Sequence, residues 1–276
     1  MREPWRNIRR YCTESLPMHA SAGHRDLGHA QRVLYTMNPS RPPEPLELRP
    51  IGVVRSCYHE RFGVPRQAGL VPAAEGEFHP FPPWDRADAW RGLEGFSHLW
   101  LIFWMHLNPQ GPAHHLVRPP RLGGNRRMGV FATRSPMRPN PIGLSVARLL
   151  GLEHRAGRVH LHLGGIDLVD GTPVLDVKPY IPYADALPGA QAGFAPQAPD
   201  PGLKVSFATK VAERLRDMGR QGVELRRLIE QVLAQDPRPA YRKGSARYGM
   251  ALAGHEIRWR RENGRVEVTA LEPRRG

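Results

Sequence analysis

Apolar and polar side chains alternate in a series of short segments between residues 50 and 180. A period of two is typical of strands that bury one face. The β-branched run in PIGVVRS (50–56) favours a strand, and the aromatic run in HLWLIFWMH (98–106) favours a buried one. The pattern predicts strands at 50–56, 76–80, 98–106, 128–133, 142–152, 158–163 and 173–180, with a single helix at 86–96.

Hardly any helical sequence separates these predicted strands. A parallel sheet needs a long crossover, usually a helix, between consecutive strands. The spacing therefore predicts a mainly β fold, either an antiparallel barrel or a sandwich, rather than a doubly wound parallel sheet.

A second unit follows a stretch rich in Ala, Gly and Pro. AERLRDM (212–218) and ELRRLIEQVLAQ (224–235) have helical spacing, and strands are expected at 247–253, 255–262 and 265–272. In HEIRWRR, Ile257 and Trp259 alternate with Arg258 and Arg260, which predicts one apolar and one cationic face. We expect a disordered extension over 1–48, a β domain over 49–190, a linker over 191–202 and a small basic α+β domain over 203–276.

The N-terminal extension shows no sustained period and ends in a Pro-rich string. An alternative is that it reflects translation from an upstream start, with Met37 the more natural beginning. It lacks the apolar stretch of a secretory signal. The longest apolar run, LWLIFWM (99–105), is too short to cross a bilayer, and only two cysteines occur. These features predict a soluble cytoplasmic protein without a disulfide framework.

The charge is strongly positive, at +14 over 276 residues, and unevenly spread. Residues 203–276 carry 17 basic and 9 acidic side chains, a net charge of +8. Such a basic region favours nucleic acid as a partner. The alternative is a general preference for arginine, which explains the choice of arginine but not the surplus of positive charge.

The run RRMGVFATRSPMRPNPIGLS (126–145) contains the most informative local pattern. Arg127, Arg134 and Arg138 surround a short apolar segment, and two prolines stiffen the turn that follows. Arginine forks suit carboxylates and phosphates, so a rigid corner carrying Arg134, Arg138 and Asn140 predicts a site for an anion or zwitterion. The alternative is a basic turn on the surface.

Metal-ligating and nucleophile motifs are weak in this chain. His160 and His162 share one face of a predicted strand, but the neighbouring sequence supplies no Asp or Glu, and we expect no metal. Asp167, Asp170 and Asp176 lie at predicted strand ends, where binding sites gather. No glycine fingerprint of a Rossmann fold and no Walker loop is present.

Five strings resemble the TsaA-like, or TrmO, family of tRNA methyltransferases. They are FGVPRQAGLV (62–71), RGLEGFSHLWLIF (91–103), VRPPRLGGNRRMGVFATRSPMRPNPIGLS (117–145), DLVDGTPVLDVKPYIPYAD (167–185) and AQDPRPAYRKG (234–244). The resemblance runs from about residue 50 to residue 273. It implies a β-barrel enzyme that forms homodimers and transfers a methyl group from S-adenosylmethionine to N6 of threonylcarbamoyladenosine beside the anticodon of tRNA.

The resemblance also implies a set of site residues. Leu107 departs from the family pattern, which often has Gln there, so a contact at that position would come through the backbone. Asp170 and His106 are the candidates for a catalytic base, with no firm assignment. The cofactor contacts implied are Pro65, Arg66, Gln67, His106, Leu107, Arg134, Leu144, Asp167, Leu168, Val169 and Asp170.

RNA contacts are expected at Arg138 and in the Pro-stiffened stretch that contains Arg238, Tyr241, Arg242 and Lys243, which suits phosphates and a stacked base. The alternative for that stretch is a solvated loop between domains. For the whole protein, the alternatives are an RNA-binding regulator without activity and a methyltransferase acting on another RNA or a small metabolite.

Overall fold

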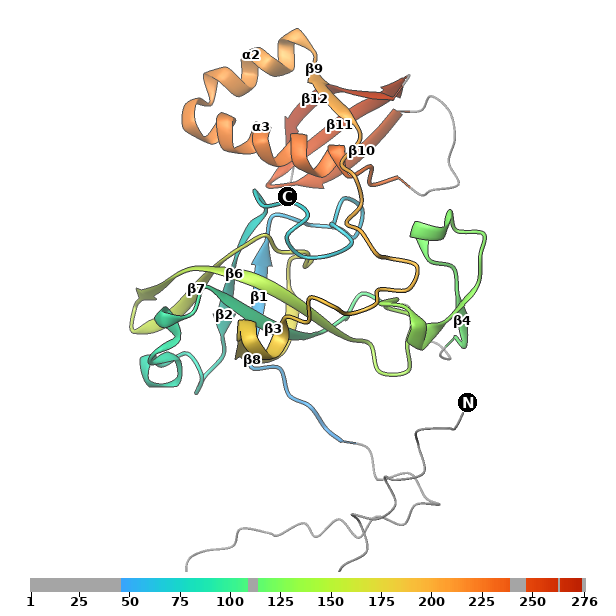
Figure 1. The fold of residues 1–276 in the computed structure, drawn as a ribbon. Helices are drawn as coiled ribbons and strands as arrows, with labels where there is room; N and C mark the ends of the chain where they lie inside the picture. The colour runs from blue at the N-terminus through green and yellow to red at the C-terminus, as the bar shows by residue number, and fades with distance from the viewer. Residues whose placement is uncertain (1–45, 109–113, 239–246, 263, 275–276) are drawn as a thin grey trace, which may run out of the picture. The chain divides into compact units, whose positions relative to one another are not determined.

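The computed structural model describes residues 46–108, 114–238, 247–262 and 264–274. Six strands close into a barrel in the order β1-β2-β7-β6-β3-β8, and every neighbouring pair is antiparallel (Figure 1). This confirms the mainly β, antiparallel barrel. The barrel strands are β1 (Gly52–Ser56), β2 (Glu75–Pro80), β3 (His98–Trp104), β6 (Ile142–Arg155), β7 (Arg158–Gly164) and β8 (Thr172–Pro179).

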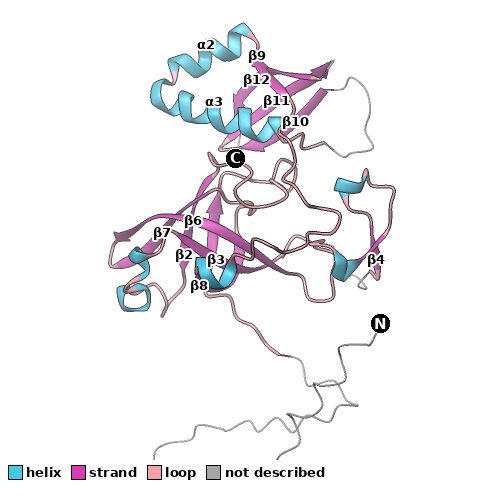
Figure 2. Cartoon of the chain, in the orientation of Figure 1, coloured by secondary structure: helices cyan, strands magenta, loops and turns pink. Residues whose placement is uncertain are grey.

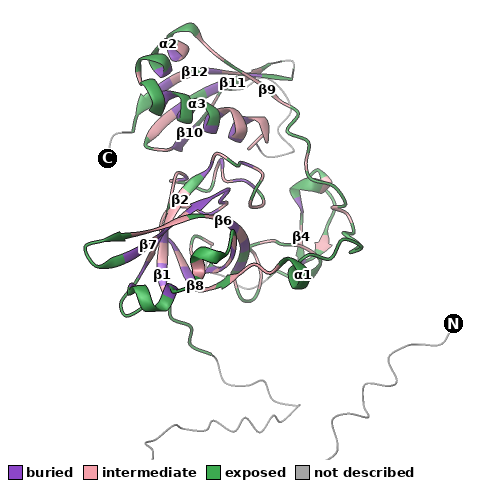
Figure 3. Ribbon diagram, turned by 60° about the vertical axis from the view of Figure 1, so that its left-hand side comes forward, coloured by how far each residue is buried: buried purple, intermediate pink, exposed green. Residues whose placement is uncertain are grey.

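The alternating pattern arises because every second side chain of a barrel strand points inward. Val54, Phe78, Leu101, Leu161 and Val174 have no exposed surface and come from five different strands. In Figure 3 the buried residues alternate mainly with half-buried ones along these strands. Side chains thus fill the barrel, and its ligand site has to lie at an end or on the outside.

Two predicted elements are wrong. The single helix at 86–96 is instead two short 3-10 turns, η2 (Ala87–Trp90) and η3 (Leu93–Gly95), because Gly92 between them adopts φ +85°. The strand at 128–133 is only β5 (Met128–Gly129), paired with β4 (Leu116–Val117), and it runs directly into the 3-10 turn η5 (Val130–Ala132). Further short elements are η4 (Pro120–Leu122) and α1 (Pro182–Asp185).

The C-terminal part is α+β, as predicted (Figure 2). Its sheet has the order β10-β11-β12-β9, and β9 is parallel to β12. Ile257 and Trp259 are buried while Arg258 and Arg260 are exposed, which confirms the two-faced strand. The elements are β9 (Lys204–Phe207), which was not predicted, α2 (Thr209–Asp217), α3 (Gly219–Ala234), β10 (Arg247–Leu252), β11 (His255–Glu262) and β12 (Arg265–Pro273).

Specific polar contacts join this part to the loop that follows β1. The Glu60 carboxylate accepts the Ala251 N–H at 2.9 Å, and the Ala73 N–H donates to the Gln231 side chain at 2.8 Å. Residues 47–276 form one compact unit, and residues 186–203 contain no helix or strand. The domain limits at 190 and 203 stay predictions, and the extension over 1–48 lies almost wholly outside the described residues. None of the described helices is long and apolar enough to cross a membrane.

Candidate functional site

A cavity of about 640 Å³ opens where the C-terminal end of β3 meets the beginnings of β6 and β8. The antiparallel register brings these ends together, since Phe103 pairs with both Gly143 and Val174. The volume is in the usual range for a small-molecule site. The lining comes from four segments, which contribute residues of 61–67, 103–108, 133–145 and 167–172.

Ten of the eleven residues predicted to contact the cofactor line this one cavity. They come from the loop after β1, the end of β3, the arginine-rich turn and the segment before β8, which are distant in the sequence. The ten are Pro65, Arg66, Gln67, His106, Leu107, Arg134, Leu144, Asp167, Leu168 and Val169.

Asp170 is the eleventh residue and does not line the cavity. Its Oδ1 accepts the Ser56 N–H at 2.9 Å, and its Oδ2 lies 3.5 Å from Arg55. Asp176 is also elsewhere, on β8, where it pairs with Lys178 at 2.9 Å. Of the three aspartates at predicted strand ends, only Asp167 lines the cavity. Asp170 instead anchors the turn that carries Asp167.

Asp167 has the most unusual environment in the cavity. Its Oδ1 is buried and has no hydrogen-bond partner among the described residues. Burial raises the pKa of the carboxyl to about 6, against hydrogen bonds from Ser145 and backbone N–H groups and the charge of Arg134, which lower it. A buried acceptor without a donor is costly, so this atom is suited to an amine or hydroxyl of a ligand.

Cationic side chains line the same cavity. Arg134 donates to the Gln67 side-chain oxygen, which ties the arginine-rich turn to the loop after β1. Arg138 donates to the Thr133 carbonyl at 3.1 Å and supports the turn from within. Arg127 is exposed and lies outside the lining, so only two of the three arginines belong to the predicted anion site.

Several lining residues were not identified from the sequence. Phe103, Met105 and Ile142 give the cavity an apolar side, and Ser145 hydrogen-bonds Asp167. The one available signal was the alternation on 142–145, which places Leu144 on the opposite face of the strand from Gly143 and Ser145. Residues from both faces of the strand line the cavity at this end of β6, so the alternation could not indicate which of them belong to the site.

The predicted RNA-binding stretch is only partly described, because Tyr241, Arg242 and Lys243 lie outside the described residues. Arg238 is 5% exposed, its guanidinium donates to both Asp236 oxygens at 2.7 and 2.9 Å, and it lies 5.7 Å from the Tyr248 ring centroid. This corrects the expectation that Arg238 faces phosphates. A guanidinium held by a carboxylate and an aromatic ring is structural.

The expectation that no carboxylate accompanies His160 and His162 is also wrong. Glu77 of β2 and Glu153 of β6 lie beside these histidines of β7, and the His162 Nε2 is 2.8 Å from a Glu153 oxygen. The sequence separates these residues by up to 85 positions, and only the register of the barrel brings them together.

Comparison with known proteins gives consistent matches. The tRNA-methyltransferase O N-terminal domain matches residues 53–186, and the TrmO C-terminal domain matches residues 200–274. The tRNA (adenine(37)-N6)-methyltransferase of Escherichia coli K12 is 52% identical over 227 residues, covering 81% of this chain and 97% of that protein. A putative S-adenosylmethionine-dependent methyltransferase of Pseudomonas aeruginosa is 51% identical over 213 residues, covering 76% and 90%. The crystal structure of TrmO from P. aeruginosa superposes with a TM-score of 0.69 at 41% identity, covering 84% and 99%.

Proposed function

The chain belongs to the TrmO family, and on that premise we propose that it is an S-adenosylmethionine-dependent methyltransferase acting on N6 of adenosine 37 in tRNA. The observation that carries this proposal is a single cavity in which Arg134 and the buried Asp167 carboxylate, with its unpartnered Oδ1, lie together with eight other residues that the family resemblance predicts. We further propose that the substrate adenosine bears a threonylcarbamoyl group. The carboxylate of that group suits a cavity lined by Arg134 and Arg138.

The residues present fit the proposed cofactor. Its carboxylate matches Arg66 or Arg134, and its amine or ribose hydroxyls match the buried Asp167 oxygen. Leu144 supplies apolar cover of the kind that an adenine ring needs. When bound, S-adenosylmethionine supplies an electrophilic methyl group on a sulfonium. Because that methyl is already activated, the main work left to the protein is alignment and exclusion of water.

The chain's own residues have two tasks in such a reaction. The first task is to orient the ligand. The turn of residues 133–138 carries Arg134, and the hydrogen bond from Arg134 to the Gln67 side chain fixes the direction of the guanidinium. A ligand bound to Arg134 is oriented by that guanidinium. The second task is to take up the proton that leaves a weakly basic N6 nitrogen. His106 lines the cavity whereas Asp170 does not, so His106 is the better placed of the two candidate bases.

We propose that the protein acts in the cytoplasm as a homodimer. Trp104, Leu107, Ile142 and Leu144 expose 40–52% of their surface at or beside the cavity, which supports a partner chain covering this edge. Light scattering on the purified full chain tests the dimer. A monomer at micromolar concentration would contradict it.

Nucleoside mass spectrometry of tRNA from a deletion strain tests the activity. We expect loss of the methylated threonylcarbamoyladenosine alone, restored by the wild-type gene. In vitro, tRNA carrying the threonylcarbamoyl group should accept a labelled methyl, and a transcript with plain adenosine should not. Efficient methylation of the plain transcript would contradict the substrate. Uptake of cofactor and tRNA without transfer would favour a non-enzymatic RNA-binding protein.

Arg134→Ala should weaken S-adenosylmethionine binding about ten- to a hundredfold, because a charge-assisted hydrogen bond to a carboxylate contributes roughly 1.5–3 kcal/mol. Calorimetry on the full chain measures this. Arg127→Ala is the matched control, since Arg127 belongs to the same segment but does not line the cavity. Equal affinities of the two variants would remove Arg134 from the cofactor site.

A further inference from the structure

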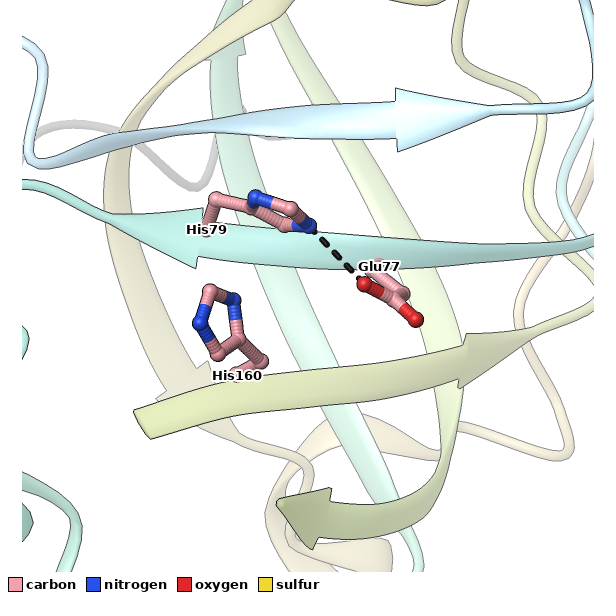
Figure 4. A group of neighbouring side chains, drawn as sticks. All are labelled: Glu77, His79 and His160. Atoms are coloured by element: carbon pink, nitrogen blue, oxygen red, sulfur yellow. Dashed lines mark hydrogen bonds and ion pairs between the residues drawn. The ribbon is translucent and has the colours of Figure 1, made fainter. Parts of the chain in front are cut away.

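The outer face of the barrel carries a second group of chemically active side chains, away from the cavity described above. Phe78 and Leu161 pair across β2 and β7 and are fully buried, so their sequence neighbours point outward. Glu77, His79 and His160 each offer one ligand atom there, and these three atoms lie within 4.8 Å of one another (Figure 4). None of the three lines the cavity that holds Asp167.

The geometry of these side chains leaves one polar atom without a partner. The His79 Nε2 is 2.9 Å from a Glu77 oxygen, and the rings of His79 and His160 lie edge to face with centroids 4.5 Å apart. The His160 Nδ1 is buried and has no hydrogen-bond partner among the described residues. In Figure 4 the His160 ring faces the His79–Glu77 pair. A buried nitrogen of this kind needs a ligand or a donor to offset its lost hydration.

We propose that Glu77, His79 and His160 bind a divalent transition-metal ion of the Zn²⁺ type. Two imidazoles and one carboxylate are a ligand set that suits zinc, and three protein ligands leave a fourth position for water. Around a tetrahedral zinc ion, ligand atoms lie about 3.3 Å apart. Atoms already within 4.8 Å reach that spacing through small side-chain rotations, with the His79–Glu77 hydrogen bond replaced by two metal bonds.

The surrounding residues hold the Glu77 carboxylate in place. Arg155 donates to both Glu77 oxygens at 3.0 and 3.1 Å, and Glu153 accepts a further bond from Arg155. His162 also contacts both carboxylates, at 3.5 Å from Glu77 and 2.8 Å from Glu153. Outer hydrogen bonds of this kind orient metal ligands and are part of a working site.

A second cavity, of about 470 Å³, reaches this group at Glu77 and gives an ion a path to that carboxylate. Its other lining residues are Glu75, Gly76, Leu150, His162 and Leu163.

Calorimetric titration of the metal-stripped full chain with Zn²⁺ tests the proposal, with Mg²⁺ as the comparison ion. Other residues, such as Cys12, also offer zinc ligands, so the readout is the difference between variants. The double variant His79→Ala/His160→Ala should lose one equivalent of Zn²⁺, and each single variant should bind that equivalent at least about tenfold more weakly. His154→Ala is the matched control, because His154 is an exposed histidine of neighbouring β6 outside the group.

Thermal unfolding gives an independent readout, since an ion that binds only the folded state raises Tm. Zn²⁺ should raise the Tm of the wild type and of His154→Ala more than that of the double variant. If the double variant does not fold, Glu77→Gln takes its place with the same expectation. Wild-type stoichiometry, affinity and Tm shift in the ligand variants would show that these side chains form only a hydrogen-bonded network and would overturn the proposal.

Discussion

Asp167 and Asp170 lie three positions apart in one turn and experience opposite environments. Asp170 is held by the Ser56 N–H and by Arg55, so its charge is compensated inside the protein. Asp167 keeps one oxygen buried and unpaired in the cavity, and burial raises its pKa to about 6. A buried charge that is only partly hydrogen-bonded destabilises the folded state. The ionised Asp167 therefore lowers the free energy of unfolding of the ligand-free protein, but it provides a preformed hydrogen-bond acceptor for a ligand.

This cost predicts a pH-dependent gain of stability in Asp167→Asn. The folded pKa of about 6 exceeds the unfolded value of 3.8, so the folded protein binds more protons across that interval and loses stability as the pH rises through it. At pH 7 the variant should gain up to about 3 kcal/mol in free energy of unfolding without ligand, and near pH 4 the gain should nearly vanish. Its affinity for S-adenosylmethionine should fall.

Urea unfolding at the two pH values measures the effect of Asp167→Asn. Asp176→Asn serves as control, because Asp176 lies on β8 outside the cavity and pairs with Lys178. We expect that control to leave cofactor affinity unchanged. A destabilised Asp167→Asn variant at pH 7 would show that the ionised carboxylate is well compensated in the ligand-free protein.

At the scale of elements, strand β6 links the barrel wall to the site. It pairs with β3 on one side and β7 on the other, and its first residues line the cavity. Gly143 lies where a Cβ atom would be 2.2 Å from the Phe103 ring. Phe103 itself lines the cavity, so the absence of a side chain at 143 sets the position of that ring.

Gly143→Ala should therefore displace the Phe103 ring. Forcing an extra carbon into a packed region typically costs about 1–3 kcal/mol, so we expect that loss of stability together with weaker cofactor binding. Gly151→Ala is a control on the same strand, because a Cβ atom there meets nothing within 4 Å. Thermal unfolding and calorimetry compare the two variants. Equal Tm values and equal cofactor affinities for the two variants would mean that the Phe103 ring moves aside without loss of stability and that Gly143 does not shape the site.

At the scale of the whole molecule, the net charge of +14 bears on tRNA binding. If Arg242 and Lys243 bind phosphates, replacing both with alanine should raise the Michaelis constant for tRNA and leave cofactor affinity unchanged. The salt dependence of tRNA binding should flatten by up to roughly 0.7–0.9 log units for each phosphate that is no longer neutralised. Lys210→Ala/Arg214→Ala removes the same charge from the exposed face of α2 and controls for a general electrostatic effect. If the salt dependence of tRNA binding is unchanged in the Arg242/Lys243 variant, the tRNA-binding surface lies elsewhere, and residues 118–127 are the next candidate.

Removal of residues 1–45 tests the predicted domain limits at the same scale. Residues 47–276 form one compact unit, so the shortened chain should keep its Tm and its rate of methyl transfer. Differential scanning calorimetry and a transfer assay make the comparison with the full chain. A large fall in either quantity would mean that the segment packs against the barrel or against a partner chain.

The pattern along the amino-acid sequence predicted a mainly β fold, either a barrel or a sandwich, and the family resemblance supplied ten residues that line one cavity. Inward-facing residues such as Phe78 and Leu161 recur with period two because a strand turns every second side chain to the same side, and this signal is local. The ordered strings around Pro65, Arg134 and Asp167 identified a set that the structure brings to one cavity. The prediction of a helix at 86–96 was wrong because Gly92 adopts a left-handed conformation between two short 3-10 turns.

Only the tertiary structure decided which side chains meet across strands. Glu77, Glu153 and His160 come from three strands, and no sequence spacing records the register that places them on one face. Asp167 and Asp170 are not distinguished by the sequence pattern. In the structure Asp167 lines the cavity, whereas Asp170 accepts a hydrogen bond from Ser56 of β1. The sequence predicted Arg238 to be an exposed cation, but in the structure its guanidinium is bound by Asp236 and lies over the Tyr248 ring. Periodicity depends on neighbours along the chain, whereas burial and pairing depend on residues that are distant along it and are set only when the barrel closes.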